Sequence, residues 1–447
     1  MLRSDPRWYR SSVLGLLLVV AAVALWNARS LDPGAGYDAV HHIDYARGLA
    51  YHLEIPGQES RSEYYSPPLF YGLAGLATRA GDLVGITPPE RVALLGNAIV
   101  LVLAALLLLV LARIVWPGRR ALHLAALGFF CFVPVVSRTA AMFHPEPLDL
   151  LLTLAALTLA ARILVRRDLR ARPALLLGAL LGAAQLARTF GLYAWMTVVA
   201  VFALAALRRY APPRALLRSL ALATLATVLV AGPWYVRQAV LYTNPIFDQP
   251  TVAKPIWERQ RASFYVGTGL PDALTNPWRP HFKNELVPTT YNELWGDYFG
   301  IFVWNSTKAS EPPTAARRTL RAQALVGLLP TVLALAGLGM LLAAGLRRRS
   351  TFAPAALLPA VLPVLGLAGY LYFTVSYPVP DGDTLKATYM LTTAPGWALA
   401  FGFAVDRVLR ALEGRPVAAR AFVALLVVLA AIDLRVIVHG SPLGGLL

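Results

Sequence analysis

The sequence predicts an all-α, polytopic membrane protein with about eleven transmembrane helices. Of its 447 residues, 57% are hydrophobic and only 15% are charged. Apolar runs of about twenty residues recur along the chain, and each is long enough to cross a hydrocarbon core of about 30 Å. Lipid offers the backbone no hydrogen-bond partners, so these runs are expected to be helices.

The predicted spans follow one another along the chain with two long interruptions. They are residues 12–31, 90–113, 121–138, 147–165, 174–188, 190–207, 215–235, 322–346, 353–375, 386–405 and 419–437. Residues 68–86 are apolar but short, and Arg79 and Asp82 interrupt them, which favours a helix at the membrane interface. The first apolar run is rather long for a signal peptide and no small-residue cleavage pattern follows it, so it is expected to be retained.

The distribution of the +17 net charge predicts the topology. Arginines gather in alternate short loops, and nearly all the carboxylates fall in the other loops. By the positive-inside rule the N-terminus is cytoplasmic, and residues 32–89 and 236–321 form two long outer segments. The expected location is an inner or plasma membrane, and the charge is not taken to indicate a nucleic-acid partner.

This topology divides the chain into three parts. Residues 1–235 form an N-terminal membrane module that includes the first outer loop at 32–89, residues 236–321 form the second outer segment, and residues 322–447 hold the C-terminal helices. The single cysteine, Cys131, lies in an apolar run, which excludes a disulfide within the chain and a thiolate metal cluster.

The first outer loop carries the strongest candidate for chemistry. Asp38 follows the first helix by a few residues, where a carboxylate can accept a proton from a hydroxyl at the membrane surface. The alternative is that Asp38 caps the helix that follows it. His41, His42 and Asp44 lie within roughly one turn and favour a functional role. The two histidines are also candidates for a metal site, although adjacent rings point in different directions on a helix.

Further acidic and aromatic residues lie near the predicted outer ends of the helices. Glu63 and Tyr65 belong to the first outer loop and are predicted to bind substrate. Glu146 and Asp149 occur in the short outer turn FHPEPLDLLL, where they either contact substrate or stabilise the start of a helix. Around Glu293 the sequence mixes aromatic and acidic residues, for which anchoring at the membrane interface is favoured over stacking on sugars.

Cations at the outer helix ends suggest a phosphate-binding function. Arg188, Arg237 and Lys386 lie there, as does Arg138. A phosphate that leaves from a lipid headgroup needs such partners, and arginine supplies a bidentate fork where lysine supplies a point charge. The alternative is that these side chains only extend toward the membrane boundary.

The absence of several well-known sequence motifs narrows the functional class of the protein. The sequence has no GxxxxGK[ST], Rossmann glycine pattern, HExxH or GxSxG. Most predicted spans have no carboxylate at mid-depth, which disfavours an ion-coupled transporter. A non-catalytic transporter or flippase of lipid-linked saccharides remains the alternative to an enzyme.

These segments resemble the GT-C superfamily of membrane glycosyltransferases, most of all the branch with the protein O-mannosyltransferases and the aminoarabinose transferases of lipid A. The similar segments are GYDAVHH, YSPPLFYGL, HPEPLDLLL, WYVRQAVLYTNPIF and KATYMLTTAP. The chain departs from the family pattern at Ala39, Ser66 and Lys386, where the family often has Glu, His and Arg.

The resemblance implies an outward-facing glycosyltransferase with two juxtamembrane helices in the first loop. It implies a polyprenyl-phosphate sugar as donor, a hydroxyl on a lipid, glycan or protein as acceptor, and inversion at the anomeric carbon. Asp38 would be the catalytic base. Arg237, Lys386 and Arg188 would hold the leaving phosphate, while Glu146 or Asp149 would position the acceptor or a divalent metal ion, the one cofactor that the resemblance leaves open.

Overall fold

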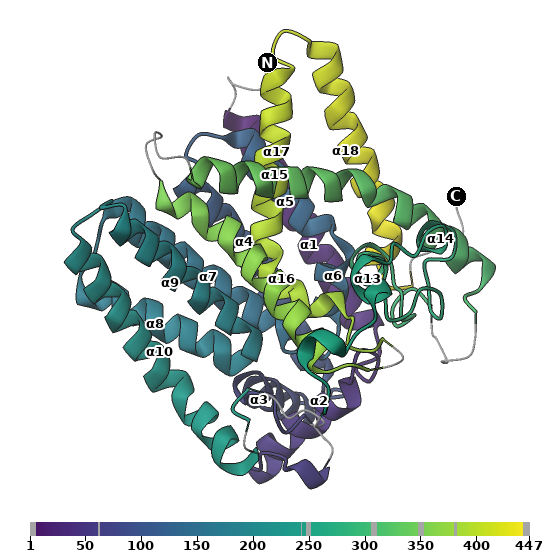
Figure 1. The fold of residues 1–447 in the computed structure, drawn as a ribbon. Helices are drawn as coiled ribbons and strands as arrows, with labels where there is room; N and C mark the ends of the chain where they lie inside the picture. Colours follow the sequence, from purple (N-terminus) through teal and green to yellow (C-terminus); the bar gives the residue numbers. More distant parts are fainter. Residues whose placement is uncertain are drawn as a thin grey trace.

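The computed structural model describes residues 6–60, 63–242, 244–246, 252–304, 311–346, 353–379 and 382–440. Within these ranges the chain is helical and has no strand, which confirms the predicted all-α class (Figure 1). Apart from the helices of the two long connections, the α-helices are α1 Pro6–Ser30, α4 Arg91–Val115, α5 Arg120–Phe132, α6 Pro134–Ala141, α7 Glu146–Arg166, α8 Ala171–Ala187, α9 Leu192–Leu207, α10 Pro213–Tyr242, α14 Thr314–Val326, α15 Leu328–Leu346, α16 Leu358–Ser376, α17 Ala394–Ala411 and α18 Pro416–Ile437.

Each predicted span overlaps one of these helices or an adjoining pair. The span predicted at 386–405 matches least well, because Ala387–Thr393 form a 3-10 helix and α17 is not among the candidate membrane spans. In the described ranges, eight helical stretches are long and apolar enough to cross a membrane, or nine if α5 and α6, which meet at a 50° bend, form one broken span. Helix α8 is apolar but shorter. The chain is therefore an integral membrane protein, and the count of eleven spans stays a prediction.

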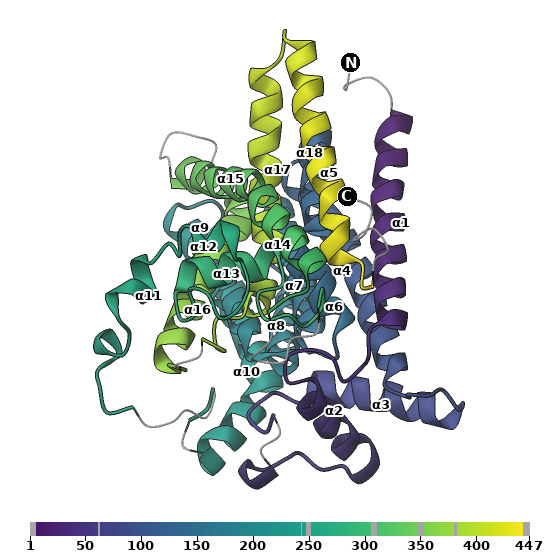
Figure 2. The same cartoon turned by 90° about the vertical axis from the view of Figure 1, so that its right-hand side faces the viewer.

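The first long connection folds into short helices at one end of the bundle. Helices α2 (Ala39–Arg47) and α3 (Leu69–Leu83) lie below the last turn of α1, and α3 packs on α4 (Figure 2). A π-helical turn, Gly48–His52, continues α2. Helix α3 is not among the candidate spans, as expected for residues 68–86.

The second long connection is also partly helical. It contains α11 (Ala262–Val266), α12 (Asp272–Thr275) and α13 (Leu286–Trp295), and α13 packs against α6. Trp278 and Trp295 are buried in this region, whereas Trp257 is exposed. The connection is therefore packed onto the membrane helices through its second half.

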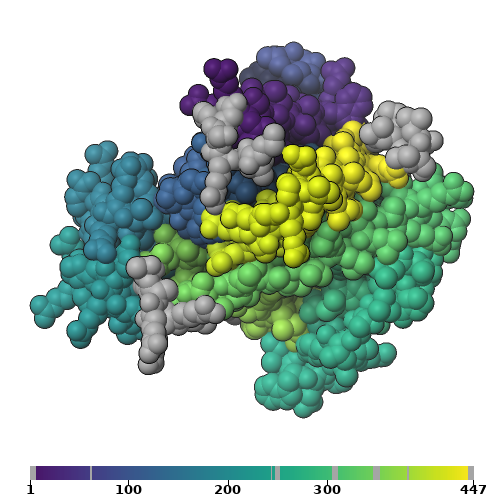
Figure 3. All heavy atoms as spheres, turned by 90° about the horizontal axis from the view of Figure 1, so that it is seen from above, coloured from purple at the N-terminus to yellow at the C-terminus, as the bar shows by residue number. Residues whose placement is uncertain are grey.

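One large apolar core joins the helices that precede α11 to those that follow α14. Helix α4 packs on α1 and α7, α8 packs on α7 and α10, and α17 packs between α5 and α15. Seen from above, the α17–α18 hairpin lies between α1 and α15 (Figure 3). Most apolar side chains of α18 remain exposed, as expected of a helix that faces lipid.

Glycines permit the closest helix contacts. A Cβ on Gly178 of α8 would overlap the carbonyl oxygen of Ala223 on α10, and one on Gly337 of α15 would overlap the carbonyl oxygen of Ala400 on α17. Thr227 Oγ1 donates a hydrogen bond to the Gly178 carbonyl oxygen at 3.1 Å across the same contact. Small residues at such crossings let helix backbones approach one another in a membrane.

We expect Gly178→Ala to destabilise the protein, because the new methyl group forces α8 away from α10. Overpacking of this kind costs about 1–3 kcal/mol. The change is measured as a lower thermal unfolding midpoint of the purified protein in detergent. Gly128→Ala on α5 is the matched control, since its Cβ would meet no atom within 4 Å. Equal midpoints for the two variants would contradict the proposed tight contact.

Candidate active site

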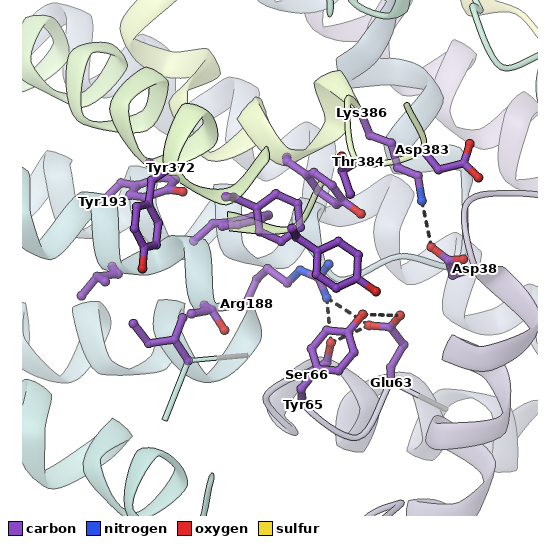
Figure 4. A pocket seen from close by; sticks show the side chains of 18 of the residues that line it. Asp38, Glu63, Tyr65, Ser66, Arg188, Tyr193, Tyr372, Asp383, Thr384 and Lys386 are labelled. Carbon is purple, nitrogen blue, oxygen red and sulfur yellow. Dashed lines mark hydrogen bonds and ion pairs between the residues drawn. The ribbon is translucent and has the colours of Figure 1, made fainter. Parts of the chain in front are cut away.

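A cavity of about 760 Å³ opens between the first connection, α9, α16 and the segment before residue 387 (Figure 4). One part of its wall is polar and the other is apolar and aromatic. The polar part includes Asp38, His41, Glu63, Tyr65, Ser66, Arg188, Asp383, Thr384 and Lys386. The apolar part includes Phe190, Leu192, Tyr193, Met196, Leu365, Ala368, Tyr372 and Phe373.

An ion pair between Asp38 and Lys386 lies at the polar end of the cavity. Lys386 Nζ is 3.0 Å from Asp38 Oδ2, and the two residues are 348 positions apart in the sequence. The ammonium group also lies 5.1 Å from the centre of the Tyr37 ring. The Lys386 side chain is 11% exposed, whereas that of Asp38 is 46% exposed because it faces the cavity. The carboxylate is thus both paired and accessible.

The ion pair determines the charge state of Asp38. Desolvation favours the neutral acid, but the Lys386 ammonium and its hydrogen bond outweigh it, and the pKa of Asp38 falls to about 2. For Lys386, burial favours the neutral amine, yet Tyr389 and Asp38 outweigh it and raise the pKa of the ammonium group. Both groups are therefore charged at neutral pH.

The backbone directs the Asp38 side chain away from the helix it precedes. Asp38 stands at the N-cap position of α2 in the left-handed region, with φ 53°, and its side chain makes no capping hydrogen bond. A non-glycine residue in this region is uncommon and often marks a functional constraint. Of the two alternatives for Asp38, side-chain capping is therefore not observed, and the carboxylate is available to the cavity.

Arg188 links three parts of the chain at the cavity wall. It follows α8, and its Nη1 donates to Ser66 Oγ at 2.8 Å and lies 3.4 Å from Glu63 Oε2. Its Nε lies 3.0 Å from Glu146 Oε1 at the start of α7. Two carboxylates therefore already neutralise this guanidinium. Ser66, which stands where the family pattern has His, is one of its hydrogen-bond partners.

A layer of histidines lies behind this cluster. His42 Nδ1 is 2.8 Å from the Tyr71 hydroxyl, and the rings of His42 and His144 are 4.7 Å apart. Nδ1 of His144 contacts a carboxylate oxygen of Glu146. Burial, which outweighs the attraction of Glu63, lowers the pKa of His42 to about 3, so this ring is neutral. His42 and Glu146 thus support the cavity wall from behind and do not line it.

The carboxylates and imidazoles of this region do not form a metal site as they are arranged. Asp38 is engaged by Lys386, and Glu63 and Glu146 are engaged by Arg188. In the described ranges, no group of three or more His, Cys, Asp or Glu side chains is placed to hold a metal ion. We therefore derive no step through a metal.

Three further predicted residues lie away from the cavity. Asp149 is fully buried and accepts hydrogen bonds from Thr392 at 2.5 Å and, more weakly, Thr153 at 3.5 Å. Arg237, near the end of α10, lies over the rings of Trp234 and Tyr242. Asp44 is on the exposed face of α2. The structure thus brings Asp38, His41, Glu63, Tyr65, Arg188 and Lys386 to one cavity, and not these three.

A buried network beside the ion pair was missed by the sequence analysis. Arg138 on α6 is 3.1 Å from Glu293 Oε1 and 3.0 Å from Asp297 Oδ1, and it also contacts the Glu293 carbonyl oxygen. Tyr37, the residue before Asp38, donates a hydrogen bond to Glu293. All four side chains are buried. Glu293 and Asp297 are thus engaged in a buried ion-pair network, and Arg138 is unavailable to a phosphate.

Other lining residues carried only weak sequence signals. Tyr389 lies in the KATYML segment, and its ring centre is 5.9 Å from Lys386 Nζ. Asp383 precedes Lys386 in DGDTLK and pairs with Arg279 from the second long connection. Their position next to a predicted site residue was the only available signal.

The arrangement of the helices has counterparts among solved structures. The oligosaccharyltransferase of Archaeoglobus fulgidus, in a crystal structure with zinc and sulfate, matches with a TM-score of 0.54 and 16% identity over 96% of this chain and 53% of its own. ArnT from Cupriavidus metallidurans, bound to undecaprenyl phosphate, matches with a TM-score of 0.51 and 19% identity over 94% of this chain and 64% of its own.

A further structure of the archaeal enzyme, AglB with an inhibitory peptide and a dolichol-phosphate, matches at a TM-score of 0.54 with 15% identity, over 97% of this chain and 56% of its own. The chain therefore spans between half and two thirds of the length of these proteins. No protein-family model and no curated protein sequence matches the chain. The likenesses confirm the GT-C type of membrane fold that the sequence predicted.

We expect Arg138→Gln to destabilise the fold strongly, because it leaves Glu293 and Asp297 buried without a cation. Removing one partner of a buried ion pair typically costs about 3–5 kcal/mol. The thermal unfolding midpoint in detergent measures the effect. Arg170→Gln, which breaks an exposed pair with Asp168, should leave the midpoint unchanged and serves as control. A small effect of Arg138→Gln would show that the network does not hold the connection in place.

Proposed function

We propose that the protein is a glycosyltransferase that moves a sugar from a polyprenyl phosphate to an acceptor hydroxyl on the outer face of the membrane. The observation that carries the proposal is the Asp38–Lys386 ion pair at the polar end of a cavity whose other wall is apolar. The fold supports it, since the similar structures include one bound to undecaprenyl phosphate and one with a dolichol-phosphate.

The two walls of the cavity suit the two ends of such a donor. Leu192, Met196 and Leu365 provide an apolar surface for the prenyl chain. Lys386 provides a cation for the phosphate. Arg188 already has two carboxylate partners, so Lys386 is the cation that the phosphate meets first. Arg237 lies outside the cavity lining and receives no role in this mechanism.

The reaction is a direct displacement at the anomeric carbon. Asp38 removes the proton from the acceptor hydroxyl, and the oxygen forms a bond to the anomeric carbon as its bond to the phosphate oxygen breaks. The proton ends on Asp38, and the electron pair leaves with the polyprenyl phosphate, whose charge Lys386 stabilises. Attack from the face opposite the phosphate inverts the configuration.

Lys386 would make the basicity of Asp38 depend on whether the donor is bound. Without donor, the ammonium group holds the pKa of Asp38 near 2, where the carboxylate is a weak base. A donor phosphate competes for the same ammonium group and draws it away from Asp38. The carboxylate then becomes a stronger base only when the sugar to be transferred is present.

The sidedness follows from the charge pattern. The first connection contributes Asp38, His41 and Glu63 to the cavity lining. Helices α2 and α3 of this connection lie at the end of the bundle opposite the first turn of α1 (Figure 2). With the N-terminus in the cytoplasm, as the arginine distribution predicts, the cavity faces the outside.

We expect Asp38→Asn to reduce sugar transfer by about 10²–10⁴-fold, the usual contribution of a general base. The assay follows a radiolabelled polyprenyl-phosphate sugar incubated with the purified protein in membranes that contain acceptors. Asp82→Asn is the control, because Asp82 is an exposed carboxylate on α3 that does not line the cavity. Equal turnover by wild type and Asp38→Asn would remove Asp38 as the base. Donor binding without any turnover by the wild type would favour a carrier.

The pH dependence provides a test of the coupling. Asp38 must be ionised to act, so activity is lost as the pH falls through its pKa. In Lys386→Met, desolvation is no longer opposed by the ammonium group and the pKa of Asp38 rises. The acid limb of kcat/KM, which reports on the free enzyme, should therefore move to higher pH, and the KM for the donor should increase. An unchanged acid limb would rule out Lys386 as the group that sets the basicity of Asp38.

A further inference from the structure

A second, smaller recess lies at the other end of the bundle from the candidate active site. Its volume is about 410 Å³, and it lies where α1 and α5 begin and α4 ends. It is lined by Tyr9, Arg10, Arg113, Gly118, Arg120 and His123. Its lining therefore contains three arginines and no carboxylate.

Tyr9 organises this recess. Arg113 Nε donates to the Tyr9 hydroxyl at 3.1 Å, and the Tyr9 hydroxyl is 3.1 Å from His123 Nδ1. His123 Nε2 is 2.9 Å from the carbonyl oxygen of Trp116, which can only accept, so Nε2 carries a proton. In the neutral imidazole, Nδ1 then accepts from Tyr9. This chain of hydrogen bonds holds the Arg113 guanidinium through its Nε alone. The two terminal nitrogens of the guanidinium take no part in the chain.

Two guanidinium groups flank the same ring. The Cζ atoms of Arg113 and Arg120 lie 5.4 and 5.8 Å from the centre of the Tyr9 ring. Nη1 of Arg120 is buried and has no hydrogen-bond partner among the residues that the structure describes. A buried donor without an acceptor costs roughly 1–3 kcal/mol, so an acceptor placed here would be favoured.

Arg119, next to Arg120 in the sequence, has a carboxylate partner, whereas the arginines that line the recess have none within the described ranges. Arg119 pairs with Asp406, which Arg410 also contacts at 2.9 Å. Arg10, Arg113 and Arg120 make no ion pair with any carboxylate of the described residues. Three positive charges thus converge on the recess without a counterion from this part of the chain.

We propose that the recess binds the phosphate group of an anionic lipid. Guanidinium groups match phosphate oxygens in geometry and charge, and the Tyr9 hydroxyl and ring hold two of them in place. Tyr9, Arg10 and Arg113 lie in the terminal turns of α1 and α4, two helices long enough to span the bilayer, so the recess is at the depth of lipid headgroups. This position favours a headgroup over a free anion as the source of the phosphate.

The binding site does not depend on the proposed glycosyl transfer. It lies at the opposite end of the bundle from the Asp38–Lys386 pair and shares no lining residue with that cavity. A failure of either proposal therefore leaves the other unaffected.

The test compares lipid retention and thermal stability in wild type and Arg10→Gln/Arg120→Gln. Neither side chain donates a hydrogen bond to the described part of the chain, so the double variant should fold. The protein is placed in nanodiscs of phosphatidylcholine alone or with phosphatidylglycerol. We expect wild type to retain phosphatidylglycerol in native mass spectrometry and to gain thermal stability from it, and the double variant to lose at least about tenfold of that preference.

Arg166→Gln/Arg172→Gln, in another arginine-rich turn, is the matched control and should behave like wild type. If both double variants lost the preference for phosphatidylglycerol equally, net positive charge alone would explain that preference, and the proposal would be overturned. Inorganic phosphate added to phosphatidylcholine discs separates the two sources. Stabilisation by free phosphate in the absence of an effect of phosphatidylglycerol would also overturn the assignment to a lipid.

Discussion

The structure depends on one fully buried guanidinium, that of Arg138. Charge this deep is tolerated only when it is paired, and here Glu293 and Asp297 from the second long connection supply the pairing. Asp297 also accepts the backbone N–H groups of residues 301, 302 and 303, so one carboxylate orders the turn after α13 as well. The connection is thereby fixed against α6, and through Tyr37 and Glu293 it fixes the backbone just before Asp38.

The bend between α5 and α6 explains how an arginine reaches this position. Pro134 has no N–H group and begins α6 at 50° to α5, so α6 leaves the direction of the span. Every residue of α6 is buried, and the bend turns Arg138 toward α13. A straight helix over residues 121–138, as the sequence predicted, would have left Arg138 at a membrane boundary. The candidate site thus depends on a broken helix.

Hydropathy and charge located the long apolar helices, because crossing lipid imposes a length and a composition on each such segment, but they gave no sign of the short helices α11 to α13. The same rules favoured Asp38 and Lys386, since polar side chains at helix ends in an apolar protein are unusual. They could not show that these two residues meet, nor that Arg237 lies outside the cavity and Arg138 inside the core. Those outcomes are set by packing between segments far apart in the chain, which leaves no local pattern.

Carboxylates balance the cations Arg188 and Lys386 that line the cavity. Arg188 is matched by Glu63 and Glu146, Arg279 by Asp383, and Lys386 by Asp38. In the proposed reaction, an anionic donor would enter a site whose cations already have partners, and it would bind only by replacing one of those partners. Asp38 is the most exposed of the partner carboxylates of Lys386 and Arg188, so its release requires the least rearrangement. In this scheme the exchange that seats the phosphate is also the exchange that frees the base.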